Sequence, residues 1–158
     1  MNSQIQVSLG YRDVEAAMRF LASAFGFEKG PIHDGDDGHI HHAEMSWPGG
    51  GTLHLHTADG NSVADLADRA VADGGYPAVS IHIDVEDPDP FYARALEAGA
   101  RVIRELQDSP HGVGTRGFIV ADPEGLYWSL GTPLPELVRK SDGRWVPVAE
   151  DQDSQATS

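Results

Sequence analysis

The chain has 158 residues, which is enough for one domain with its own hydrophobic core. Its net charge of -14, from 25 acidic and 11 basic residues, disfavours nucleic-acid binding, which needs a basic face. Cysteine is absent, so disulfides, thiolate metal sites and cysteine nucleophiles are excluded. No apolar stretch approaches the ~20 residues of a membrane span and no signal peptide is recognised. We therefore expect a cytoplasmic protein without a membrane partner.

The first half of the chain predicts a strand, a helix and three further strands. Alternating apolar and polar residues indicate the first strand over residues 5–11. The helix that follows has Asp13 as its predicted N-cap and Gly26 at its C-terminal end. Strand-like stretches then cover residues 27–32, 39–47 and 52–57.

The second half repeats this order of elements. Residues 79–85 alternate strictly between apolar and polar side chains, which predicts a strand. A helix follows, with Asp89 as its predicted N-cap, Pro90 at its first position and Gly99 at its end. Three more strands are predicted near residues 101–106, 117–121 and 126–130.

Equivalent landmarks in the two halves keep a nearly constant offset. Gly26 and Gly99 are 73 positions apart, and Gly50 and Gly125 are 75 positions apart. A repeat of this length predicts a duplicated βαβββ module rather than a solenoid, so the fold class is α+β with two tandem modules. We place a single domain over residues 1–132, with modules at about 4–57 and 79–131, a linker helix at about 62–73, a packed C-terminal extension at 133–150 and a disordered tail at 151–158.

Strand alternation sorts the side chains onto two faces. Apolar residues, with Trp47 and Trp128 among them, share the face that should pack on the helices. The opposite, polar face would line a cleft if the two sheets curl side by side, and the alternative is a face wetted by solvent. The cleft candidates on the strands are Gln6, Ser8, His42, Glu44, His54, His56, Ser80, His82, Asp84, Tyr127 and Ser129. His111 and Phe118, at the ends of a glycine-rich loop, are candidates to cover a planar ligand, with ordinary packing as the alternative.

Three segments carry a resemblance to a known family: YRDVEAAMRFLASAFGFE, HAEMSWPGGGTLHLH and GFIVADPEGLYWSLGT. With the repeat, the chain resembles the vicinal oxygen chelate superfamily, which includes glyoxalase I, extradiol dioxygenases and bleomycin-resistance proteins. The resemblance implies paired βαβββ modules that form a cupped mixed β-sheet with the helices outside. It also implies a homodimer, in which modules are often exchanged between chains.

The resemblance implies where a metal would bind. Metal-using members place ligands on the first and last strands of each module, and these positions fall at Gln6, His54, Ser80 and Ser129. Such members commonly have His, Glu or Gln there, with a carboxylate at the final position. Because serine hydroxyls are poor ligands for divalent metals, we expect no metal cofactor. The alternative is one divalent metal held by a rearranged set of His54, Glu44 and His82, which the eight histidines of the chain favour.

These observations favour binding over catalysis. We expect a small-molecule-binding protein of the metal-free, bleomycin-resistance type, which sequesters an antibiotic or other natural product and so serves antibiotic resistance. The acidic charge favours a cationic ligand, and the aromatic side chains favour a planar one. The alternative is a glyoxalase-like lyase, isomerase or dioxygenase that uses the rearranged metal site or metal-free acid–base chemistry. The sequence assigns no catalytic residue to such an enzyme.

Overall fold

The computed structural model describes residues 7–35, 37–58, 79–109 and 115–148. The first module consists of β1 (Val7–Tyr11), α1 (Val14–Phe25), β2 (Glu28–Asp34), β3 (Ile40–Ser46) and β4 (Thr52–Thr57). The second consists of β5 (Ser80–Asp84), α3 (Asp89–Glu97), β6 (Arg101–Asp108), β7 (Arg116–Ala121) and β8 (Tyr127–Gly131). A hairpin of β9 (Leu137–Arg139) and β10 (Trp145–Pro147) ends the described chain.

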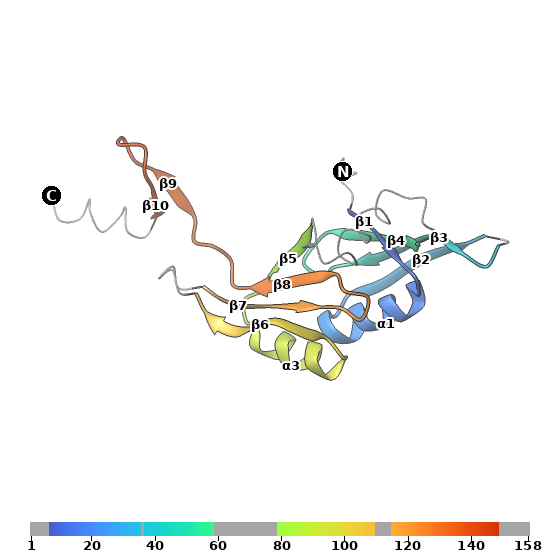
Figure 1. The fold of residues 1–158 in the computed structure, drawn as a ribbon. Coiled ribbons are helices and arrows are strands. Elements are labelled where there is room, and N and C mark those ends of the chain that lie inside the picture. The colour runs from blue at the N-terminus through green and yellow to red at the C-terminus, as the bar shows by residue number, and fades with distance from the viewer. Residues whose placement is uncertain (1–6, 36, 59–78, 110–114, 149–158) are drawn as a thin grey trace, which may run out of the picture.

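Both modules form a four-stranded mixed sheet of the same topology. The strand orders are β1-β4-β3-β2 and β5-β8-β7-β6. In each sheet the two neighbours that are first and last in the chain run parallel, namely β1 with β4 and β5 with β8, and the other neighbouring pairs are antiparallel. The two helices lie together on one side of these sheets (Figure 1). This arrangement confirms the α+β class and the two tandem βαβββ modules. None of the helices in the described ranges is long and apolar enough to cross a membrane.

The first helix begins and ends where its sequence predicts. Asp13 accepts a hydrogen bond from the backbone N–H of Ala16 at 2.9 Å, as an N-cap should. Gly26 adopts a left-handed conformation with φ of 84° and donates its N–H to the carbonyl of Ala22 at 3.0 Å. The helix therefore stops at a residue that has no Cβ to oppose this conformation.

The second helix departs from its predicted N-cap. Asp89 is already helical, and Pro88 occupies the cap position without a side-chain hydrogen bond. The Asp89 carboxylate instead accepts from the Arg116 guanidinium of β7, at 2.7 Å from Nε and 3.2 Å from Nη2. The carboxylate of Asp89, which the local sequence predicts to cap the helix, thus forms an ion pair with a distant residue instead.

The two modules share one hydrophobic core. The ring of Trp128, which is fully buried on β8, lies 5.5 Å from that of Phe25 and 5.9 Å from that of Phe27 in the first module. Near it, the hydroxyl of Tyr11 on β1 donates to Asp122 at 2.7 Å, between β7 and β8. Side chains of each module therefore complete the packing of the other, and the sheets are fixed relative to one another.

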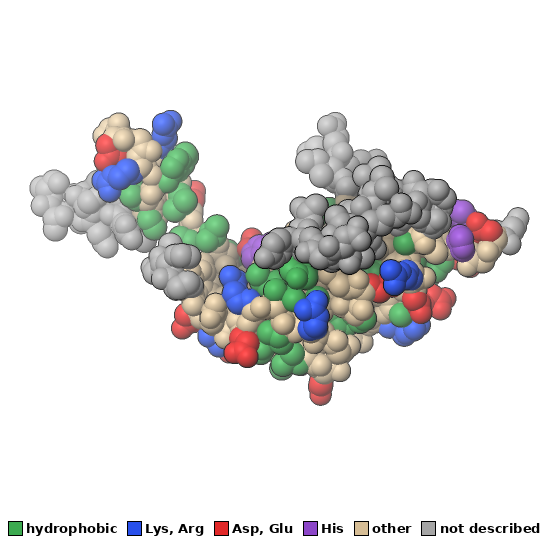
Figure 2. Space-filling model, in the orientation of Figure 1, with side chains coloured by type: hydrophobic (Ala, Val, Ile, Leu, Met, Phe, Trp, Pro, Cys, Tyr) green, Lys and Arg blue, Asp and Glu red, His purple; other side chains and the backbone are tan. Residues whose placement is uncertain are grey.

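The C-terminal hairpin projects from the body of the molecule (Figure 1), so the described residues 133–148 differ from the prediction that residues 133–150 pack on the domain. Its strands β9 and β10 pair only with each other among the described residues. Leu134, Leu137 and Trp145 are 73%, 47% and 62% exposed, and Figure 2 shows hydrophobic, basic and acidic side chains together on this segment. The packed faces of the sheets are already covered by the helices. The predicted linker helix at 62–73 and the tail at 151–158 lie outside the described residues.

Candidate ligand-binding site

Polar side chains gather on one face of the first module's sheet. The strand register places Glu44 opposite His54, and His54 beside Ser8. His42 Nε2 lies 3.0 Å from Glu44 Oε1, and the rings of His42 and His54 are 4.7 Å apart. The hydrogen bond from His42 holds the pKa of Glu44 below its usual value, and the charge of nearby imidazoles adds to this. His56, on the same strand as His54, lies with Nδ1 3.2 Å from the hydroxyl of Ser8.

The second module repeats this pattern with different side chains. His82 on β5 is paired in register with Ser129 on β8, and its Nδ1 lies 2.9 Å from the Ser129 hydroxyl. The other ring nitrogen, Nε2, lies 3.2 Å from the carboxylate of Asp84, two residues further along the strand. Ser80 is paired with Tyr127 in the same ladder. The residues that alternation assigns to one face therefore do lie on one face.

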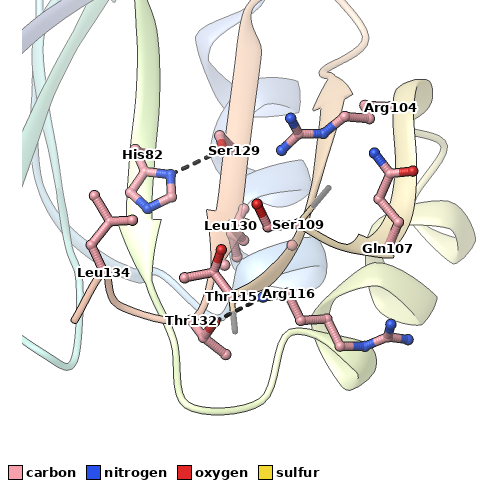
Figure 3. Close-up of a pocket in the computed structure, with 12 residues that line it drawn as sticks. His82, Arg104, Gln107, Ser109, Thr115, Arg116, Ser129, Leu130, Thr132 and Leu134 are labelled. Atoms are coloured by element: carbon pink, nitrogen blue, oxygen red, sulfur yellow. Dashed lines mark hydrogen bonds between the residues drawn. The ribbon is translucent and has the colours of Figure 1, made fainter. Parts of the chain in front are cut away.

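A pocket of about 360 Å³ opens beside His82 and Ser129 (Figure 3). The other residues that line it are Arg104, Gln107, Ser109, Thr115, Arg116, Gly117, Leu130, Gly131, Thr132 and Leu134. Two arginines and no carboxylate stand among these described lining residues. The acidic composition of the chain therefore does not extend to this pocket, and the expectation of a cationic ligand has no support there.

The two arginines of the pocket differ in their ion pairs and in where their guanidinium groups point. Arg116 is held by Asp89 and by Asp108, with Nη1 3.1 Å from the Asp108 carboxylate, and these bonds raise the pKa of its guanidinium. Figure 3 shows the Arg116 guanidinium pointing away from His82, whereas that of Arg104 lies on the side of Ser129. Arg104 therefore remains the cation that can meet a ligand in this pocket.

A second pocket, of about 370 Å³, lies where the two modules meet. It is lined by β1 and β4 residues such as Val7 and Leu53, by β5 residues from Ile81 to Asp84, and by Trp47. Trp47 is half-buried and its ring lies 5.2 Å from that of Phe27. The structure thus places Trp47 at the edge of the core, where it also lines this second pocket.

The structure corrects the predicted placement of Phe118. This side chain is fully buried, and its ring lies 5.1 Å from that of Tyr92 on the helical side of the sheet. It is paired in register with Leu130, so it shares the packed face and cannot cover a ligand in the cleft. Gln6 and His111, the remaining cleft candidates, lie outside the described residues.

The metal positions implied by the resemblance do not fit a metal. Of the four, His54, Ser80 and Ser129 are described, and only His54 offers a strong ligand. The Ser129 hydroxyl is engaged with His82. The alternative metal site expected from the sequence consists of His54, Glu44 and His82. In the structure the ligand atoms that lie close together belong instead to His42, Glu44 and His54. His82 is on the other sheet and is not one of this group.

The comparisons with known proteins agree with this architecture. The chain belongs to the Glyoxalase/Bleomycin resistance protein/Dioxygenase superfamily, whose family model matches residues 4–130. It is 36% identical over 126 residues to the Uncharacterized protein Mb0911c of Mycobacterium bovis, covering 79% of this chain and 80% of that protein. The structure is similar to that of TioX from Micromonospora sp. ML1, with 28% identity, a TM-score of 0.63, and coverage of 84% of this chain and 100% of that one. A glyoxalase-related enzyme from Fulvimarina pelagi shares the fold at 21% identity, with a TM-score of 0.58 over 92% and 98% of the two chains.

Proposed function

We propose that the protein binds a small molecule in the pocket beside His82 and Ser129, and that this binding needs no metal. The observation that carries the proposal is the Ser129 hydroxyl, which lies 2.9 Å from Nδ1 of His82. The resemblance assigns to Ser129 the position where metal-using members of the superfamily typically have a carboxylate. A hydroxyl paired with an imidazole is suited to recognise a polar group of a ligand, and it is a poor partner for a divalent ion.

The lining of the pocket favours a ligand with an acidic or carbonyl group and an apolar body. Its volume of about 360 Å³ suits a small organic molecule. Arg104 offers a planar fork of donors, which matches a carboxylate, and Leu134 offers apolar surface at the rim. We therefore propose sequestration of an acidic natural product such as an antibiotic.

Arg104→Ala should weaken the binding of a planar aromatic carboxylic acid about tenfold or more, because a charge-assisted hydrogen bond is lost. The measurement is a calorimetric titration of chelator-treated protein with a panel of such acids, their neutral amides and the matching amines. Arg101→Ala, an exposed arginine at the start of the same strand and outside the pocket lining, is the control and should leave the affinity unchanged. Preferential binding of the amines, or equal loss in both variants, would show that Arg104 does not select an anionic ligand.

A second candidate function is metal-free acid–base catalysis. It is favoured by the chain of hydrogen bonds from Ser129 through His82 to Asp84, since an imidazole oriented by a carboxylate can accept a proton from a bound substrate. Conversion of a bound compound that is lost in His82→Asn would establish this function. Unchanged recovery of the compound supports binding alone.

We also propose that the protein is a homodimer in which the β9–β10 hairpin packs on a second copy. An isolated two-stranded hairpin is marginal in water, and this one exposes Leu137 and Trp145. Residues 133–148 hold three basic and two acidic residues in a chain of net charge -14, so the hairpin is complementary in charge to another copy's body.

Trp145→Glu should shift the protein from dimer to monomer, because it places a charge in the centre of the proposed contact. Sedimentation analysis over a range of concentrations measures the change. Leu96→Glu, the same kind of substitution at a partly exposed position of α3, is the matched control and should leave the dimer intact. A wild-type protein that is monomeric at every concentration, or a dimer that survives Trp145→Glu, would rule out this interface.

A further inference from the structure

A group of metal-binding side chains lies on the first module, apart from the pocket described above. Ligand atoms of His42, Glu44 and His54 all lie within 4.8 Å of one another. His42 and Glu44 belong to β3, and His54 belongs to the neighbouring β4. None of the three lines either of the two pockets described above. Two of them stand on the third strand of the module, so the group differs from the first-and-last-strand positions implied by the resemblance.

The strand ladder explains why these side chains converge. His42 and Glu44 are two residues apart and point to the same face, and Glu44 is directly opposite His54. The 3.0 Å between His42 Nε2 and Glu44 Oε1 is close to the spacing of two ligands on one ion. Two atoms that each lie about 2.0–2.2 Å from a tetrahedral Zn²⁺ are separated by roughly 3.3–3.6 Å. A ligand atom of His54 lies within 4.8 Å of the ligand atoms of both, so the three side chains face a common point.

The chemistry and the exposure of the group suit a metal ion. Two imidazoles and one carboxylate form a donor set that binds Zn²⁺ and other divalent transition metals. The side chains of His42 and Glu44 are 35% and 36% exposed, so an ion can reach them from solvent while the sheet holds their backbone. A surface ion pair needs only His42 and Glu44, and it does not account for His54.

We propose that His42, Glu44 and His54 bind one divalent transition-metal ion of the Zn²⁺ class on this face of the first module. Three protein ligands leave at least one coordination position for water or for an oxygen of a small molecule. His33, whose ring lies 5.8 Å from that of His42, flanks the group on the β2 side. The site is separate from the pocket at Ser129, so metal binding here leaves the proposed metal-free binding there unaffected.

The test is calorimetric titration of untagged, chelator-treated protein with Zn²⁺, with Co²⁺ as a spectroscopic probe of coordination. We expect one equivalent of tightly bound ion per chain. His54→Ala and Glu44→Gln should each weaken binding at least tenfold and should change the Co²⁺ absorption spectrum. Circular dichroism of each variant checks that it remains folded.

The matched control is His41→Ala, which removes an exposed histidine whose Nε2 lies 3.2 Å from the Asp37 carboxylate. It should leave the affinity for Zn²⁺ unchanged. Loss of binding in His41→Ala with full binding in His54→Ala would place the ion at Asp37 instead and overturn the proposal. Failure of the wild-type protein to bind Zn²⁺ would also overturn it. Neither outcome affects the titration with aromatic acids, which is done without metal.

Discussion

Trp128→Ala should lower the free energy of unfolding by about 3–5 kcal/mol, the usual cost of emptying a large aromatic site in a core. Trp128 is fully buried, and its ring contacts Phe25 and Phe27 from the other module. The cavity would therefore open at the junction of the modules, where both sheets lose packing. Urea-induced unfolding followed by circular dichroism measures the change.

Trp128→Phe is the informative control for this prediction. It keeps an aromatic ring in the core but removes the indole N–H, which donates to Asp122 at 3.1 Å. The expected loss is about 1–2 kcal/mol, because the cavity is smaller and one hydrogen bond disappears. An alanine variant that loses less than the phenylalanine variant would show that Trp128 does not hold the modules together.

Asp122→Ala should lower the free energy of unfolding by about 3–4 kcal/mol, because it leaves several donors without an acceptor in a buried place. One carboxylate oxygen accepts from the Tyr11 hydroxyl and the Trp128 indole, at 2.7 and 3.1 Å. The other accepts from the backbone N–H groups of Glu124 and Leu126, both at 3.0 Å. Urea titration measures the loss. Tyr11→Phe, which removes one of the four donors, should cost about 1–2 kcal/mol, and a larger cost there than in Asp122→Ala would contradict this reading.

Asp122 also predicts a dependence of stability on pH. Burial raises the pKa of its carboxyl group above the ordinary value, although four hydrogen bonds oppose this. The folded state therefore binds the proton more tightly than the unfolded state does. Its contribution to stability is present below the unfolded pKa and is lost as pH rises through the folded pKa. The free energy of unfolding of the wild type, relative to that of Asp122→Asn, should accordingly grow as pH falls into the acid range, in urea titrations at a series of pH values.

Local signals in the sequence predict the order of the helices and strands and several of their bounds. Asp13 and Gly26 bound α1 because capping is settled within one turn. The strand β4 occupies the predicted residues 52–57, because period-two alternation and the preceding glycine turn both mark it. Asp89 was assigned wrongly because its carboxylate pairs with Arg116, which is 27 positions away.

The candidate site was predictable only where strands are regular. Alternation put His82 and Ser129 on one face, and the structure adds that they are hydrogen-bonded. Arg104 was missed because β6 has register shifts on both sides of it, and such irregularities break the alternation on which sequence reading depends. In the proposed metal site His42 stands in place of His82, because the order of the strands, which the sequence does not give, decides which histidines are neighbours. Likewise, whether residues 133–148 pack on their own domain depends on which surfaces the rest of the fold leaves uncovered, and the local sequence does not show this.

The most direct test of the proposed function is equilibrium dialysis of chelator-treated protein against the aromatic acid that binds best, followed by mass spectrometry of the recovered compound. Metal-free binding predicts saturation near one molecule per chain, an affinity that does not change when Zn²⁺ is restored, and recovery of the acid chemically intact. Binding that appears only after metal is restored, or recovery of a converted product, would contradict it.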